Sequence, residues 1–279
     1  MHPDFDQRIC AFQDFVNGKN GIYDDCAHGT HVAGILAGSG RLSNHVYSGI
    51  APAANLCVLK VLDREGNGSN EQVLRGIDWV LQNQRKYGIR LVNLSVGMPD
   101  RDCIKKEMEL TDAVERLWDA GLVVVVSAGN AGPKSGTVAV PGTSRKVITV
   151  GASDETQKSR NGRKKGLRGM AYRNGNPPGG YSGRGPTREC IVKPDVVAPG
   201  TNVISCNGHY RTKHSAAYVS KSGTSMATPV VTGAAALLLS KYPDMENVEI
   251  KMRLMQCVDP VNEAFPWGML NVRKLLEEN

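Results

Sequence analysis

The sequence has few of the features that mark zinc proteins, membrane proteins or secreted disulfide-bonded domains. None of its seven cysteines stands at CxxC spacing, so zinc and redox motifs have little support. No apolar run approaches membrane-spanning length, and the first residues, Met-His-Pro-Asp-Phe, lack the basic and apolar regions of a signal peptide. An odd, scattered set of cysteines is typical of free thiols in a reducing compartment. We therefore expect a cytoplasmic protein with no membrane partner, and secretion stays open if the natural N-terminus lies upstream.

Aromatic residues are also scarce. They make up only 5% of the 279 residues, whereas 31 residues are glycine and 41% are apolar. This composition favours closely packed helices on a sheet over an all-β sandwich. The length suits one large domain, so we expect residues 1–279 to form a single unit and the protein to be a monomer.

Acidic residues are absent from one stretch, between Gln157 and Arg173. The same stretch contains seven basic residues, which account for the whole net charge of +7. Because the rest of the chain is balanced, the charge indicates one local basic loop and not a basic face of the fold. We interpret 153–180 as an exposed basic insertion. It lacks interleaved aromatic residues beyond Tyr172, so a nucleic-acid partner is unlikely.

Apolar patterns predict alternating strands and helices along most of the chain. Predicted strands 56–62, 89–95, 122–127 and 147–150 alternate with predicted helices 73–87 and 107–120. Such alternation implies right-handed crossovers and a parallel sheet. A helix over 28–37, a buried helix over 225–241 and closing helices over 247–257 and 272–278 complete the prediction. The fold class is therefore α/β, with a mostly parallel central sheet between two layers of helices.

Two distant motifs carry the chemistry. His28-Gly29-Thr30-His31-Val32-Ala33-Gly34 begins one predicted helix, and Gly223-Thr224-Ser225-Met226-Ala227-Thr228-Pro229 begins another. A serine at a helix N-terminus lies beside free backbone N–H groups, which favour a developing oxyanion. Together with VVVVSAGN at 123–130 and NLSVG at 93–97, these motifs resemble the subtilase family of serine endopeptidases. The resemblance extends from the segment 2–5 to 268–271.

The resemblance implies a role for each matching residue. Ser225 matches the nucleophile, His28 the general base and Asn130 the side-chain donor of the oxyanion hole. Ser95, Val96 and Gly97 match the segment that pairs with an extended substrate. Ala128 and Gly129 match the opposite wall of the primary specificity pocket. His31, one turn after His28, matches a residue that is not the base, and we expect it to be structural. The sequence does not reveal the preferred substrate residue.

The family's third catalytic residue has no match. It is an aspartate at the end of the first sheet strand, in a D-[ST]-G sequence that precedes the segment matching His2 to Phe5. Asp4, Asp24 and Asp25 match other positions of the family pattern. We therefore expect the chain to start after that interior strand, either through a wrong start or through a real truncation. Without the aspartate, His28 lacks the partner that orients it, so this chain is expected to be at best a feeble protease.

Metal and cofactor requirements are expected to be slight. The resemblance implies no cofactor. Asp4 matches a position that binds calcium in some family members, but the loop 38–49 lacks the familiar ligand sequence, so a structural calcium has weak support. Cys26, two residues before His28, is expected near the substrate cleft, either as a filler thiol or as a site of mercurial inhibition.

The leading hypothesis is a serine endopeptidase that acts on polypeptide substrates. An α/β-hydrolase esterase has poor support, because GTSMA is not the GxSxG elbow. The rival is a catalytically impaired fragment or pseudoprotease that acts only as a peptide-binding domain. Labelling of Ser225 by a fluorophosphonate distinguishes the two, because it requires an activated hydroxyl.

Overall fold

The computed structural model describes residues 1–97, 104–153, 180–210, 215–261 and 267–277. The helices are η1 (Pro3–Phe5), α1 (His28–Ala37), η2 (Arg41–Ser43), α2 (Asn70–Tyr87), α3 (Ile104–Asp119), α4 (Thr224–Lys241), α5 (Asn247–Gln256) and α6 (Val272–Leu276). The strands are β1 (Ile9–Asp14), β2 (Leu56–Lys60), β3 (Leu91–Leu94), β4 (Val123–Ser127), β5 (Ile148–Ser153), β6 (Val196–Pro199), β7 (Val203–Cys206), β8 (Tyr218–Lys221), β9 (Val258–Pro260) and β10 (Gly268–Leu270).

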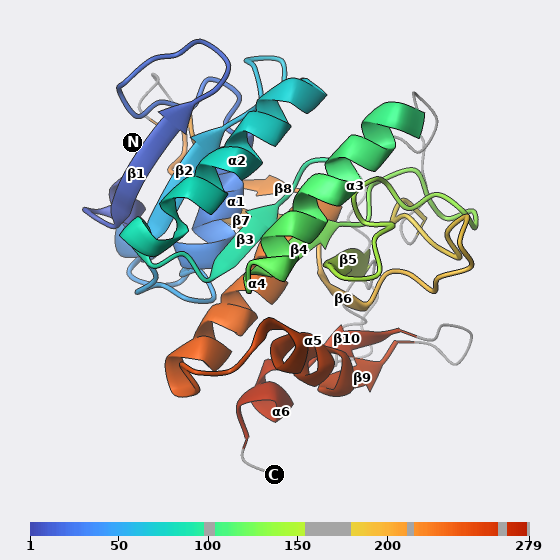
Figure 1. Ribbon diagram of the computed structural model, residues 1–279. Coiled ribbons are helices and arrows are strands. Elements are labelled where there is room, and N and C mark those ends of the chain that lie inside the picture. Colours follow the sequence, from blue (N-terminus) through green and yellow to red (C-terminus); the bar gives the residue numbers. More distant parts are fainter. Residues whose placement is uncertain (98–103, 154–179, 211–214, 262–266, 278–279) are drawn as a thin grey trace.

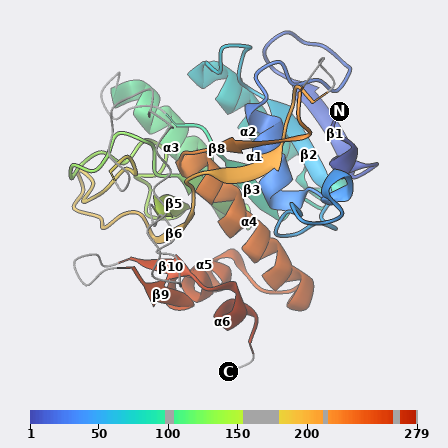
Figure 2. The same cartoon turned by 180° about the vertical axis from the view of Figure 1, so that it is seen from behind.

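A six-stranded sheet forms the centre of the molecule. Its strand order is β3-β4-β5-β6-β10-β9, and every neighbouring pair is parallel except β10 with β9. Figure 1 shows α2 and α3 on one face, and Figure 2 shows α1 and α4 on the other. The predicted three-layer α/β architecture with a mostly parallel sheet is confirmed.

Local sequence explains where the main elements begin and how they pack. The Ser69 hydroxyl and the Gln72 side chain form a capping box at the start of α2, and Gly88 ends that helix with a φ of 60°. The four valines of β4 are completely buried between the helix layers, as expected for an interior parallel strand. Helix α4 is buried over most of its surface and contacts β3, β4, β5 and β6.

The sheet is interrupted on its N-terminal side. Strands β1 and β2 form a separate parallel pair, and β7 and β8 form an antiparallel pair. Among the described residues β2 pairs only with β1, and β3 pairs only with β4. The chain nevertheless passes from β2 through α2 to β3, the crossover that normally joins strands of one sheet.

Some sequence predictions concern residues that the structure does not describe or describes only in part. The predicted basic insertion, 153–180, coincides almost entirely with 154–179, which lie outside them. Six cysteines lie in the described part of the chain, and all six are free thiols, as predicted. Within the described ranges, none of the helices has both the length and the apolar character needed to cross a bilayer.

Candidate active site

Ser225 is the second residue of α4, beside the end of β3. Its hydroxyl donates a hydrogen bond of 3.0 Å to the carbonyl oxygen of Ser95. The Ser95 hydroxyl donates one of 3.1 Å to the Ser225 carbonyl in return. Because Ser225 lies in the first turn of α4, its backbone N–H has no carbonyl partner within the helix. This N–H and the positive end of the helix dipole suit an anion beside the hydroxyl.

His28 is the first residue of α1 and approaches the same carbonyl from the other side. Its Nε2 atom lies 3.4 Å from the Ser95 oxygen. Burial lowers the pKa of His28 below its ordinary value of 6.5, and the charge of Lys221 lowers it further. The imidazole is therefore neutral at pH 7, the form that accepts a proton. The Ser225 hydroxyl and the His28 imidazole converge on one oxygen atom, although each of the two interactions is with Ser95.

Asn130, which follows β4, reaches the nucleophile loop with its side chain. Its Oδ1 atom accepts hydrogen bonds from the Thr224 backbone N–H at 3.0 Å and from the Thr224 hydroxyl at 3.1 Å. These two bonds fix the amide next to Ser225 and leave its Nδ2 group as the donor. The predicted grouping of Ser225, His28 and Asn130 therefore brings together a hydroxyl, a base and an amide donor.

The two predicted substrate-binding segments come together behind this group. Ser95–Gly97 follows β3 and Ala128–Gly129 follows β4, at the carboxyl ends of neighbouring parallel strands. A Cβ atom at Gly97 would lie 3.2 Å from Cβ of Ala139, and one at Gly129, where φ is 83°, would lie 2.6 Å from the same atom. The positive φ and the close approach at Gly129 together favour glycine there.

Backbone hydrogen bonds fix the segment Ala128–Gly129 in place. The Ala128 carbonyl accepts from the Ala139 N–H at 2.9 Å, and the Gly129 carbonyl accepts from the Gly183 N–H at 2.8 Å. A Cβ atom at Gly183 would overlap the Ala128 carbonyl oxygen. This packing therefore requires glycine at position 183.

Side chains of β3 and α4 hold Ser95 in place. The Asn93 amide donates to the Ser95 hydroxyl at 2.9 Å, and the Thr232 hydroxyl of α4 donates to the Asn93 oxygen at 2.9 Å. The sequence predicted Ser95 as a substrate-binding residue. It gave no sign that the Ser95 carbonyl would be the shared acceptor of the nucleophile and the base, because that role depends on how α1 and α4 pack against β3.

Carboxylates near His28 are engaged elsewhere. Within the described ranges no carboxylate forms an ion pair with His28. The Asp24 carboxylate accepts from the N–H groups of Cys26, Ala27 and Thr30 and from the Thr30 hydroxyl. Burial raises the pKa of Asp24, but these hydrogen bonds outweigh it and lower the pKa overall. Asp25 forms an ion pair of 2.6 Å with Lys60.

Lys221, on β8, was not singled out from the sequence. Its Nζ group donates a hydrogen bond of 2.7 Å to the carbonyl of Ala27, the residue before His28. Burial lowers the pKa of Lys221. A lysine four residues before a nucleophile has no signature in the sequence, so this neighbour of the base could be found only in the structure.

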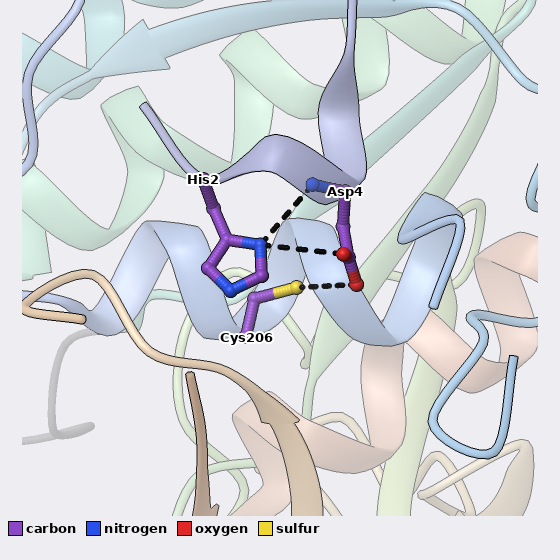
Figure 3. Close-up of side chains that lie close together, drawn as sticks. All are labelled: His2, Asp4 and Cys206. Carbon is purple, nitrogen blue, oxygen red and sulfur yellow. Dashed lines mark hydrogen bonds and ion pairs between the residues drawn. The ribbon is translucent and has the colours of Figure 1, made fainter. Parts of the chain in front are cut away.

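A second cluster of polar side chains, His2, Asp4 and Cys206, is buried under η1 and β7 (Figure 3). The Asp4 carboxylate accepts from the backbone N–H groups of Gly40 and Leu42, from the Tyr218 hydroxyl at 2.8 Å and from the Cys206 thiol at 3.5 Å. Burial raises the pKa of the Cys206 thiol, so it stays protonated. The lone pairs that a metal ion needs are therefore used by hydrogen bonds within the protein.

His31 behaves as expected of a structural residue. It is fully buried, and its Nε2 atom lies 2.9 Å from the Val219 carbonyl. Burial lowers the pKa of His31 to about 4. The imidazole stays neutral and joins α1 to β8.

The sequence matches the model of the family described as "Subtilase family" over residues 1–268. It is 39% identical over 280 residues to serine protease AprX of Bacillus subtilis, covering 95% of this chain and 60% of that protein. It is 33% identical to subtilisin DY of Bacillus licheniformis, covering 96% of this chain and 84% of the relative. The chain thus spans about 60% of the length of AprX.

Solved structures give the same result. The S41 psychrophilic protease superposes with a TM-score of 0.73 at 27% identity, over 92% of this chain and 78% of that one. Sphericase superposes with a TM-score of 0.72 at 26% identity, with the same two coverages. Sequence and fold therefore indicate the same group of proteins.

Proposed function

This chain belongs to the subtilase family, and on that basis we propose that it is a serine endopeptidase that uses Ser225, His28 and Asn130. The Ser225 oxygen attacks the carbonyl carbon of a peptide bond while His28 takes the hydroxyl proton. The Asn130 amide and the Ser225 N–H donate hydrogen bonds to the resulting oxyanion. His28 then gives the proton to the leaving amine, and water hydrolyses the acyl-enzyme through the same base.

One observation carries this proposal. The Ser225 hydroxyl and the His28 Nε2 atom lie 3.0 and 3.4 Å from the single Ser95 carbonyl oxygen, so hydroxyl and base converge on the same atom. The lowered pKa of His28, caused mainly by burial, supports its role as a base at neutral pH. The segment Ser95–Gly97 lies next to this pair and suits an extended polypeptide as substrate.

The test is covalent labelling of the 279-residue chain with a fluorophosphonate, followed by turnover of a chromogenic peptide. We expect labelling of Ser225 that is lost in Ser225→Ala. Ser222→Ala is the matched control, because Ser222 lies on the same loop but its hydroxyl accepts from the Asn202 N–H. Labelling that persists in Ser225→Ala, or none in the wild type, contradicts the proposed chemistry.

The rival function, a peptide-binding protein with impaired chemistry, also has a specific observation in its favour. The Ser225 hydroxyl donates to Ser95 and not to His28, and no carboxylate in the described part of the chain forms an ion pair with His28. Loss of the aspartate from a catalytic triad costs roughly 10⁴-fold in kcat. Saturable binding of peptides without any labelling of Ser225 favours this function.

The remaining parts of the proposal are the expectations drawn from the sequence. We propose a monomer that requires no cofactor, acts on polypeptides and does not bind nucleic acid. A structural calcium near Asp4 remains weakly supported, because hydrogen bonds occupy that carboxylate. The cytoplasmic location stays a prediction.

A further inference from the structure

Two free thiols, Cys10 and Cys57, lie side by side where β1 and β2 pair. The strands are parallel, and the register pairs Ile9 with Leu56 and then Ala11 with Cys57. Two steps along β1 therefore match one step along β2. Cys10 is the extra residue of this β-bulge, directly beside Cys57.

The pairing places the Cα atoms of the two cysteines within the span of a disulfide. Paired strands lie about 4.8 Å apart and rise about 3.3 Å per residue, so even a full residue of offset leaves the two Cα atoms about 5.8 Å apart. Disulfides join residues whose Cα atoms are about 4.4–6.8 Å apart. The bulge also breaks the alternation of side chains along β1, so Cys10 is not forced onto the face opposite to Cys57.

The Cys10 sulfur faces the neighbouring strand. Its thiol donates a hydrogen bond of 3.8 Å to the Arg8 carbonyl oxygen, and the same oxygen accepts one of 2.8 Å from the Leu56 N–H of β2. Because this carbonyl points toward β2, a sulfur atom beside it lies near Leu56 and the next residue, Cys57. Burial raises the pKa of the Cys57 thiol, and the charge of Cys10 raises it further. The two sulfur atoms therefore interact.

The two thiols differ in exposure. Cys10 is exposed to solvent, whereas Cys57 is half-buried. An oxidant in solution reaches the exposed thiol first, and a shielded neighbouring thiol can then resolve the oxidised sulfur as a disulfide. Cys10 suits the first of these roles and Cys57 the second.

We propose that Cys10 and Cys57 form a redox-sensitive dithiol, which hydrogen peroxide oxidises to a disulfide between β1 and β2. The Cys10 thiolate attacks one peroxide oxygen, so an S–O bond forms, the O–O bond breaks and hydroxide leaves to become water. The Cys57 sulfur then attacks the Cys10 sulfur. The S–S bond forms, the S–O bond breaks, and the Cys57 proton leaves with the hydroxyl as a second water. The two thiols lose two electrons and two protons, and the peroxide is reduced to two waters.

The disulfide fastens an edge strand. Among the described residues β1 pairs only with β2, and Figure 1 shows β1 at the outer edge of the molecule. The loop that the bond closes contains all of α1, so the bond restricts the unfolded chain over this whole region. The oxidised protein should therefore unfold at a temperature several degrees higher than the reduced protein.

The experiment treats the full chain with one equivalent of hydrogen peroxide, alkylates the remaining thiols and maps the peptides by mass spectrometry. We expect one linked pair, Cys10 with Cys57, together with the higher unfolding temperature. Dithiothreitol should reverse both. Cys10→Ser and Cys57→Ser should each abolish both, whereas Cys190→Ser should retain both. Cys190 is the matched control, because it is likewise exposed but lies in the turn that Thr187 and Ile191 close.

The single variants also test the order of the steps. In Cys57→Ser the Cys10 sulfur has no resolving thiol, so it should stop at the sulfenic acid and react with dimedone. In Cys10→Ser, dimedone should not label Cys57, because the oxidant reaches it poorly. Equal labelling of both residues would contradict the assigned roles.

A trivalent arsenical tests the spacing without oxidation and without a variant. Phenylarsine oxide bridges two neighbouring thiols, so one equivalent should protect both Cys10 and Cys57 from alkylation. Cys10→Ser should weaken its binding at least about tenfold. The proposal is overturned if peroxide takes Cys10 to the sulfinic acid while Cys57 stays reduced, or links either residue to any other cysteine. These readouts concern thiols alone, so they do not depend on the activity of Ser225.

Discussion

The proposed nucleophile and the proposed base lie in two regions of the molecule, one built on a continuous sheet and one separated from that sheet. Ser225 and Asn130 belong to the region of β3 to β6 and α4, where all four strands are paired in one sheet and α4 contacts each of them. His28 belongs to the region of β1, β2 and α1, and a cavity of about 570 Å³, lined by β2 and β3, lies between this region and β3. We call these the continuous region and the interrupted region.

The difference is visible in how each side chain is held. Asn130 and Ser225 take part in hydrogen bonds of 3.0 and 3.1 Å that tie β3, β4 and α4 together. Among the described residues, the His28 side chain makes one hydrogen bond, of 3.4 Å, to the Ser95 carbonyl. The residues of the proposed oxyanion site are therefore held firmly, whereas the His28 side chain has no second hydrogen-bond partner among the described residues to fix its orientation. Catalysis depends strongly on such fixing.

A matched pair of core substitutions tests this contrast most strongly. Ile148→Ala in β5 and Ile77→Ala in α2 remove the same atoms, and both isoleucines are buried. Ile148 is fully packed, so its loss should cost about 4 kcal/mol in the free energy of unfolding. Ile77 already lines the cavity, so Ile77→Ala should lower the free energy of unfolding by only about 2 kcal/mol. Urea denaturation measures both, and equal costs would mean that the space beside Ile77 is packed.

The second test concerns the oxyanion site. Asn130→Ala should slow fluorophosphonate labelling of Ser225 by about 10²–10³-fold, because it removes a fixed donor to the developing charge. Asn130→Asp is the matched control, since it keeps an acceptor for Thr224 but replaces the Nδ2 donor with a negative charge. Labelling of Ser225 in Asn130→Asp should be at least as slow as in Asn130→Ala. If Asn130→Asp labels at the wild-type rate, the role of Asn130 is only to support Thr224.

The sequence predicted the fold wherever an element was long and strongly patterned. The helix expected over 28–37 is α1 with the same bounds, and the valine run became β4. Short elements were missed. Strands β8, β9 and β10 have only three or four residues each and depend on pairing with distant segments. Such strands carry too few residues for a period to show.

The sequence likewise predicted some features of the candidate site and missed others. Motifs located Ser225, His28 and Asn130, because each follows from a recognisable segment at the start of a helix or the end of a strand. The shared Ser95 carbonyl, Lys221 beside Ala27 and the cavity between β2 and β3 could not be predicted. They depend on how elements far apart in the sequence pack together, and no local pattern records that.

The smallest expected effect tests the electrostatics of the interrupted region. Burial is the leading cause of the lowered pKa of His28, and the charge of Lys221 is the next. Lys221→Met removes that charge, so the pKa of His28 should rise toward 6.5 and remain below it. Because the neutral imidazole is the base, the midpoint of the pH dependence of Ser225 labelling should move upward by the same amount. Lys86→Met, on the exposed last turn of α2, should leave the midpoint in place. An unchanged midpoint in Lys221→Met would show that solvent entering through the interrupted region screens this charge from the base.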